Sequence, residues 1–263
     1  MIVSQVILSL FSGSVVGLSL GLIGGGGSIL AVPLLVYAVG VSSPHVAIGT
    51  SAVAVTVNAL INLVGHARSN NVKWPCAIVF AIFGVAGAAL GAHFGKAVDG
   101  QKLLVAFGIL MIVIAALMLR PKRSGDNPSV RLDLESARTL FPKLAASGSV
   151  VGALSGFFGI GGGFVIVPGL VTATSMPLLN AIGSSLVSVA AFGTTTAISY
   201  AASGLVDWPL AALFIVGGVA GGTAGIRLGS VLARNRQYLS FAFSGVVAIV
   251  GLYVVLKGIS VLS

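Results

Sequence analysis

Charge is scarce in this chain. Charged side chains make up 7% of its 263 residues, whereas a soluble domain carries about 25%. No Asp, Glu, Lys or Arg occurs in 1–67 or in 144–206. One membrane-spanning helix needs about 20 apolar residues, so each stretch holds about three crossings. Backbone polar groups in lipid must be satisfied within a helix, and the polar alternation of a membrane β-barrel is missing. We therefore predict an all-α polytopic membrane protein.

Other absences exclude several functional classes. The single cysteine, Cys76, allows no internal disulfide and no cysteine metal cluster. The chain has no Walker-type loop and no nucleophile–base–acid set, and no strand precedes its glycine runs, so we expect no enzyme, no cofactor and no metal. The predicted spans contain no carboxylate, which argues against a carboxylate proton relay. The net charge of +9 lies in short loops and indicates membrane orientation rather than nucleic-acid binding.

The chain is two copies of one pattern. Gly13-Ser-Val-Val-Gly17 recurs as Gly148-Ser-Val-Val-Gly152, and Val72-Lys-Trp-Pro75 corresponds to Val206-Asp-Trp-Pro209. Duplicated membrane halves are typical of transporters, which bind substrate between the copies. The predicted units are a first membrane repeat at 1–119, a linker at 120–143 and a second membrane repeat at 144–263.

Each repeat is predicted to hold about five membrane segments. The second segment is short, contains Pro33 or Pro168, and follows a glycine-rich turn. It need not cross fully, in which case eight spans rather than ten would be counted. The predicted segments are 3–23, 27–42, 46–65, 74–94 and 103–119, then 145–158, 162–175, 180–200, 208–228 and 238–257.

The basic residues predict the orientation. With an odd number of crossings per repeat, eleven of the 14 Lys and Arg residues fall on the linker side, against Lys96, Lys102 and Lys257. The positive-inside rule then predicts a cytoplasmic linker, both termini outside, and repeats of inverted topology. Aligned Lys73 and Asp207 agree with inversion, since the basic loop would face the cytoplasm and its acidic counterpart would not.

Two aligned glycine-rich turns are the most specific local signal. They read Gly24-Gly-Gly-Gly-Ser-Ile-Leu-Ala-Val-Pro33 and Gly159-Ile-Gly-Gly-Gly-Phe-Val-Ile-Val-Pro168. Such turns let a ligand approach the main chain, and a helix that starts there directs its positive end at an anion. The alternative is close helix packing. The predicted substrate-binding residues here are Gly24, Gly25, Gly26, Gly27, Ser28, Gly161, Gly162 and Gly163.

The third segment of each repeat is unusually polar. Thr50, Asn58 and Asn62 are separated by eight and four residues and share roughly one helical face. Uncharged donors suit a small oxyanion, whereas the alternative is hydrogen bonding between helices. That alternative is favoured for single serines and threonines, and function is favoured for the two amides, which are costly to bury without a partner. The predicted binding residues are Thr50, Ser51, Asn58, Asn62, Ser184, Ser185 and Thr196.

Structural roles are predicted for two further groups. Small residues of the fourth segments are expected to pack helices closely; they are Gly84, Ala88 and Gly91, then Gly218, Gly222 and Gly225. The three histidines fit no metal motif and lie near predicted segment ends, so we interpret them as interfacial; they are His45, His66 and His93.

Together these features resemble the sulfite exporter TauE/SafE family, also called the four-toluene-sulfonate uptake permeases. The resemblance rests on the paired glycine elements with Val-Pro, the following Gly49-Thr-Ser51 and Gly183-Ser-Ser185, the Val-x-Trp-Pro starts and the length, and it covers nearly the whole chain. The second copy departs at Ile160, Gly163 and Phe164, so the two half-sites are not chemically equal.

The resemblance implies a secondary transporter, an exporter of small sulfur-containing anions such as sulfite, thiosulfate or organosulfonates. Its partners would be that anion and the lipid bilayer of the cytoplasmic membrane. The alternatives are a passive anion channel and a non-transporting membrane component of sulfur metabolism. The sequence leaves the oligomeric state open.

Overall fold

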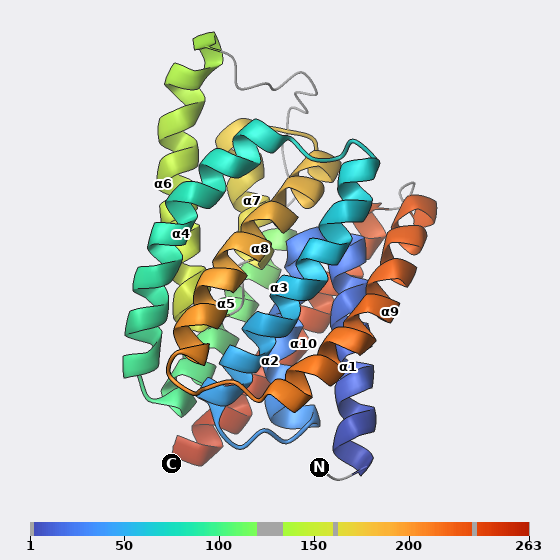
Figure 1. Cartoon of the computed structure of the whole chain (residues 1–263), viewed down its shortest axis with the longest axis vertical. Helices are drawn as coiled ribbons and strands as arrows, with labels where there is room; N and C mark the ends of the chain where they lie inside the picture. The colour runs from blue at the N-terminus through green and yellow to red at the C-terminus, as the bar shows by residue number, and fades with distance from the viewer. Residues whose placement is uncertain (1–2, 120–133, 160–162, 233–235, 263) are drawn as a thin grey trace.

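The chain forms an elongated bundle of helices (Figure 1). This computed structural model describes residues 3–119, 134–159, 163–232 and 236–262, which contain helices and turns but no strand. Among these residues, eight helices are long and apolar enough to cross a membrane. The prediction of an all-α polytopic membrane protein with eight countable spans is confirmed.

The elements follow the predicted segments closely. In the first repeat they are α1 Val3–Ile23, η1 Gly24–Leu30, α2 Ala31–Pro33, η2 Leu34–Ala38, α3 Pro44–Arg68, α4 Trp74–Ala97 and α5 Gly100–Leu119. In the second they are α6 Leu134–Phe158, α7 Gly163–Thr174, α8 Leu178–Ala201, α9 Trp208–Leu232 and α10 Arg236–Leu262.

Local chemistry explains several boundaries. Ser43 precedes α3 and accepts a hydrogen bond from the Val46 N–H at 3.5 Å, and Pro44 occupies the first helical position, where its missing N–H is not needed.

α6 differs from expectation because it begins at Leu134 rather than near 145. Its first turns consist largely of helix-forming residues that extend beyond the apolar span, so part of the predicted linker belongs to α6.

The glycine-rich turns interrupt the second segment, as predicted. In the first repeat the chain continues from α1 into the 3₁₀ helix η1, a single α-helical turn and a wide π turn. In the second repeat the corresponding α7 spans Gly163–Thr174, which is shorter than a full crossing. These short elements lie in the middle of the bundle beside α3 and α8 (Figure 1).

Helices of one repeat pack along helices of the other. α1 lies along α9, and α6 lies along α4. At successive turns Gly13, Gly17 and Gly21 of α1 meet the backbone of Phe214, Gly218 and Gly222. In the same way Gly148, Gly152 and Gly156 of α6 meet the backbone of Phe80, Gly84 and Ala88. The predicted packing role of the small residues in the fourth segments is confirmed, because each is the contact point of a helix from the other repeat.

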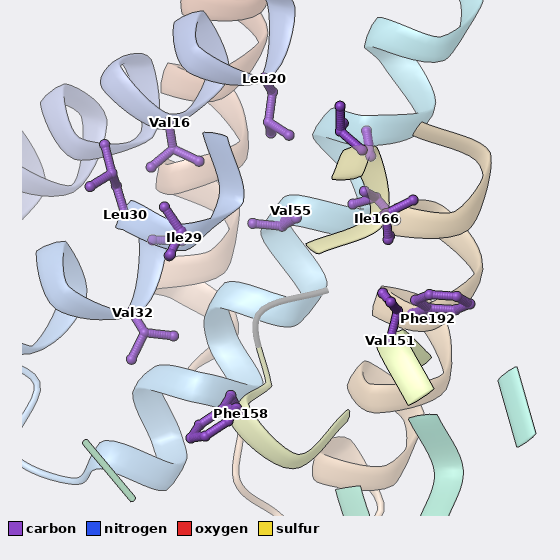
Figure 2. Packing of buried hydrophobic residues seen from close by; sticks show 14 of the residues in the cluster. Val16, Leu20, Ile29, Leu30, Val32, Val55, Val151, Phe158, Ile166 and Phe192 are labelled. Carbon is purple, nitrogen blue, oxygen red and sulfur yellow. The ribbon is translucent and has the colours of Figure 1, made fainter. Parts of the chain in front are cut away.

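The hydrophobic core lies between the repeats. Figure 2 shows Val16, Leu20 and Ile29 of the first repeat on one side and Ile166 and Phe192 of the second on the other. Large apolar side chains also cover the outer helix faces, for example Phe11 of α1, which is 64% exposed. An apolar exterior of this kind suits contact with lipid.

The first prediction concerns the contact between α1 and α9. A Cβ at Gly17 would overlap the carbonyl oxygen of Gly218, so Gly17→Ala should force the helices apart and cost about 1–3 kcal/mol of unfolding free energy. Unfolding of the purified protein in detergent micelles measures the change. The control is Gly245→Ala on α10, where an added Cβ has no heavy atom within 4 Å. Equal stability of the two variants would contradict the close backbone contact.

Candidate functional site

The third helices of the two repeats, α3 and α8, lie side by side in the centre of the bundle (Figure 1). They are antiparallel, because Gly49 near the start of α3 meets Leu205 just beyond the end of α8, and Gly183 near the start of α8 meets Asn71 just beyond the end of α3. The sequence predicted binding residues on both helices. α3 and α8 together form one central layer of the bundle, which contains both sets of predicted residues.

The first predicted group holds the ends of this layer together. The Asp207 N–H donates to Thr50 Oγ1 at 2.9 Å. At the other end the Lys73 N–H of the first repeat donates to Ser184 Oγ of the second, also at 2.9 Å. Thr50 and Ser184 occupy aligned positions, so the same side chain-to-backbone bond occurs at each end. Both hydroxyl oxygens therefore already accept a hydrogen bond in this structure.

The glycine turn of the first repeat is attached to α8. The Gly25 N–H donates to Ser185 Oγ at 3.2 Å, and Ser185 in turn donates to the Ile182 carbonyl at 2.7 Å. Ser28 closes the turn by donating to the Gly25 carbonyl at 2.9 Å. Gly24 has φ +71°, and an added Cβ would lie 2.8 Å from Ile182 atoms. Glycine is required there by both conformation and space.

In the described part of the second repeat, the glycine turn contacts α3 as the glycine turn of the first repeat contacts α8. Gly159 has φ +66°, and its Cα faces the Ile48 side chain of α3 so closely that a Cβ would overlap it. Ser51 donates to the Ile48 carbonyl at 2.9 Å, as Ser185 does to that of Ile182. Gly163 begins α7, whereas the predicted Gly161 and Gly162 lie outside the described residues.

The remaining glycines of the first turn are fully enclosed. Gly26 and Gly27 are buried within η1. A Cβ on Gly27 would overlap Ser19 and Leu20 of α1. The space beside Gly27 is thus filled by the chain itself, which favours the packing interpretation at that position.

The two predicted amides behave differently from the serines. Asn58 and Asn62 are 0% and 1% exposed. Asn62 Nδ2 donates to the Asn58 backbone carbonyl at 2.8 Å, but Asn62 Oδ1 and both polar atoms of the Asn58 side chain have no hydrogen-bond partner. Asn58 faces Gly218 and Asn62 faces Gly222 on α9. Buried polar groups are nearly always hydrogen-bonded, so this exception needs an explanation.

α8 carries unpartnered groups as well. Thr196, aligned with Asn62, is 0% exposed and its hydroxyl has no partner. Ser188, about two turns earlier on the same helix, is also buried and its hydroxyl has no partner among the described residues. Phe192 occupies the position aligned with Asn58 and packs over Gly84 of α4. The layer is therefore amide-rich on the α3 side and aromatic on the α8 side.

The three histidines lie near helix ends, as the sequence predicted, but they differ in burial. His45 is half-buried with Nε2 3.1 Å from the Val98 carbonyl oxygen, and His93 is exposed beside Phe94, as expected near an interface. His66 lies in the last turn of α3, near the end of the span as predicted, but it is 7% exposed and its ring lies close to the Gly21 backbone of α1. Its spacing of four residues from Asn62 was the signal for a place on the same face.

The layer combines anchored hydroxyls with free neutral donors and acceptors. α3 before Arg68 and the whole of α8 contain no Asp, Glu, Lys or Arg. Asn58 and Asn62 face α9, whereas Ser188 and Thr196 share the face of α8 that carries Phe192, which packs on Gly84 of α4. The free neutral groups of the described residues therefore form two sets, one on each central helix, and neither helix places a carboxylate beside them.

The second prediction tests the anchored hydroxyls. Ser185→Ala leaves the buried Gly25 N–H without its acceptor, and we expect a loss of about 1–3 kcal/mol in unfolding free energy. The matched control is Ser69→Ala, since Ser69 also donates to a carbonyl of its own helix, that of Gly65, but is exposed. Detergent-phase unfolding of both variants gives the comparison. A Ser185→Ala protein as stable as Ser69→Ala would mean that the attachment of η1 to α8 contributes nothing.

Comparison with known proteins agrees with this architecture. The profile of the family described as sulfite exporter TauE/SafE matches residues 9–254. A probable membrane transporter protein of Xylella fastidiosa (strain 9a5c) is 47% identical over 97% of both chains. The probable membrane transporter protein YunE of Bacillus subtilis (strain 168) is 30% identical over 88% of both. No solved structure is significantly similar to the chain. The protein therefore belongs to the sulfite exporter TauE/SafE family of membrane transporters.

Proposed function

We propose that the protein is a secondary carrier that exports small sulfur-containing anions across the cytoplasmic membrane. Sulfite, thiosulfate and organosulfonates are the substrates that fit the family. The observation that carries the proposal is the set of buried, unpartnered neutral side chains between the repeats: Asn58, Asn62 and Thr196. An anion would accept a hydrogen bond from the free Nδ2 of Asn58 or from the free hydroxyl of Thr196.

The charge distribution supports an anionic substrate. The central helices α3 and α8 carry no carboxylate that would repel an anion. Three basic residues lie at the end of the layer where α3 finishes. Arg68 ends α3, Lys73 lies beside Ser184, and Arg227 follows Ile226, whose side chain abuts Gly65. Such a cluster raises the local concentration of anions at the mouth of a site.

The glycine turns would position the binding groups. Gly24–Ser28 is fixed to α8 through Ser185, and Thr50, Ser51 and Ser184 fix the ends of α3 and α8. Movement of one repeat against the other would displace these attachments together. Gly161–Gly163 would play the corresponding part in the second repeat. Broken helices at a repeat interface commonly hold anions in this way.

Burial favours a carrier over a passive channel. Asn58 and Thr196 are 0% exposed, and glycine contacts close α9 over the amide face of α3. A pore that conducts passively would leave its lining exposed to water. A closed site that opens alternately to each side is the behaviour of a carrier.

The helix directions support inverted repeats. The aligned helices α3 and α8 are antiparallel. In Figure 1 α1 begins at the lower end of the bundle and α6 begins at the upper end. With inverted repeats, eleven of the 14 Lys and Arg residues of the sequence fall on the linker side, so we propose that the linker is cytoplasmic and that both termini are outside.

The third prediction concerns the free side chains. Thr196→Val and Asn62→Ala should each lower sulfite or thiosulfate flux into proteoliposomes by about tenfold or more. Thr196→Val removes a free hydroxyl donor, and Asn62→Ala removes an amide donor that would turn from the Asn58 carbonyl to the anion. A charge-assisted hydrogen bond of this kind is worth about 1.5–3 kcal/mol. Thr196→Val should keep or raise stability, since the hydroxyl it removes has no partner in the closed protein.

The matched control is Thr194→Val on the same helix. Thr194 is exposed and its hydroxyl donates to the Ala190 carbonyl at 2.6 Å, so the change should leave flux intact. If Thr196→Val and Asn62→Ala transport as well as Thr194→Val, the binding site proposed here is wrong. Saturable counterflow stimulated by substrate on the far side would distinguish a carrier from a channel.

The fourth prediction concerns orientation. Cys76 is buried at 1% exposure, so a Cys76→Ser background removes the native thiol with little disturbance. In intact cells a membrane-impermeant maleimide should label Ser203→Cys, and should label Ser69→Cys and Arg138→Cys only after permeabilisation. All three positions are exposed. The reverse pattern would place the linker outside, and labelling of Ser69→Cys and Ser203→Cys from one side would refute the inversion.

A further inference from the structure

A lysine joins the two repeats at the end of the central layer opposite to Arg68. Lys96, in the last turn of α4, donates to the Ser199 carbonyl of α8 at 3.0 Å and to Ser203 Oγ, just beyond α8, also at 3.0 Å. α4 belongs to the first repeat and α8 to the second, so the ammonium group bridges the boundary between them. In the proposed orientation this end of the layer faces the outside of the membrane.

The Lys96 ammonium group has only neutral oxygen acceptors among the described residues. The described carboxylates of this end cap helices instead. Asp99 Oδ1 accepts from two N–H groups of the first turn of α5, at 3.0 and 3.1 Å, and Asp207 Oδ1 accepts from the Leu210 N–H at 3.1 Å. An ammonium group binds an anionic oxygen more strongly than a neutral one. An anion that reached Lys96 would therefore compete with the end of α8 for this group.

Lys96 also stands at the end of a row of buried hydroxyls on α8. Phe192, Thr196 and Tyr200 follow at intervals of four residues and share one face of the helix. Phe192 packs on Gly84 of α4, and about three turns further along α4 the Lys96 Nζ lies 5.8 Å from the centroid of the Tyr200 ring. Between these contacts the Thr196 hydroxyl is buried and has no partner among the described residues, and the Tyr200 hydroxyl is in the same condition.

The row places Lys96 next to the proposed anion ligand Thr196. Ser199, whose carbonyl accepts from Lys96, follows Thr196 by three residues, which is less than one turn of α8. An anion that leaves Thr196 toward this end of the layer therefore meets the Lys96 ammonium group within about one helical turn.

The other repeat does not repeat this lysine. Lys96 aligns with Ser230 of α9, which is uncharged. The serine at the end of the central helix is repeated, because Ser203 and the aligned Ser69 each donate to the carbonyl four residues earlier, at 3.2 and 3.1 Å. A residue needed only for packing of the repeats would be expected at both ends of the layer. The charge at one end indicates a task that belongs to that side of the membrane.

We propose that Lys96 binds the transported anion on the outer side of the membrane, where it exchanges the end of α8 for the anion. This inference rests on the proposed function. In the closed structure Lys96 holds α4 against α8. When the repeats move apart at this end, the ammonium group loses Ser199 and Ser203, and the anion replaces them. In the state open to the cytoplasm Lys96 stays on α8, so it contributes to binding from the outer side alone.

The test compares transport from the two faces of the membrane. Right-side-out and inside-out vesicles are prepared from cells that produce the protein, and uptake of labelled sulfite and thiosulfate is corrected with vesicles that lack it. Lys96→Gln keeps a neutral donor for the Ser199 carbonyl but removes the charge. It should raise the half-saturation concentration at the outer face by about tenfold or more and leave the inner-face value unchanged. If Lys96 only joined α4 to α8, its loss would favour the outward-open state and lower the outer-face value.

The matched control is Lys102→Gln on α5. Lys102 lies at the same end of the bundle and is exposed, so the variant loses the same charge on the same side. It should leave both half-saturation concentrations unchanged. A Lys96→Gln protein that behaves like Lys102→Gln, or whose outer-face value falls, would refute the anion-binding role of Lys96.

Ser203→Ala is the second variant, and it keeps the charge. It frees one donor of the Lys96 ammonium group, so the half-saturation concentration at the outer face should fall by about twofold or more. An unchanged or higher value would overturn the role of Lys96, even where Lys96→Gln folds poorly. Each of these negative results, obtained with vesicles that take up sulfur anions, leaves the proposed function standing. Vesicles that take up no sulfur anion from either face would remove both.

Discussion

The contact that the rest of the structure depends on is backbone against backbone between the repeats. α1 reaches α9 through Gly17 and Gly218, and α6 reaches α4 through Gly152 and Gly84. Each first helix therefore packs on the fourth helix of the other repeat, and neither repeat buries its own small-residue face. In lipid there is little hydrophobic gain from helix association, so close van der Waals contact between small residues must hold the helices. The central pair α3 and α8 is enclosed as a consequence.

The polar residues of the enclosed helices α3 and α8 fall into two groups, one hydrogen-bonded and one without partners. At the ends of α3 and α8, Thr50 and Ser184 accept hydrogen bonds from main-chain N–H groups of the opposite repeat. Along their middle, Asn58 and Thr196 find no partner. The first set stabilises the closed arrangement, whereas the second destabilises it. A difference of this kind between neighbouring residues of one helix is typical of a site that is completed by a ligand.

Much of the fold could be read from the sequence because the repeat and the charge-free runs are local signals. The starts of α4 and α9 at Trp74 and Trp208 and the short second segments were predicted correctly. The pairing of hydroxyls could not be predicted, since whether Ser185 meets Gly25 depends on how the repeats interleave. The burial of His66 could not be predicted for a related reason: it lies near the end of α3, as its position in the sequence indicated, but whether other helices cover it depends on how the repeats pack.

The unpartnered groups also argue that the closed structure is one of at least two states. Leaving a buried donor or acceptor unsatisfied costs about 1–3 kcal/mol, and Asn58, Asn62, Thr196 and Ser188 share this condition within one layer. Apolar residues of similar shape would stabilise the closed state, as Phe192 does at the position aligned with Asn58. Retaining the polar groups keeps that state from becoming too stable relative to open ones. The same side chains that would bind the anion thereby keep the energies of the closed and open states close enough for the repeats to move.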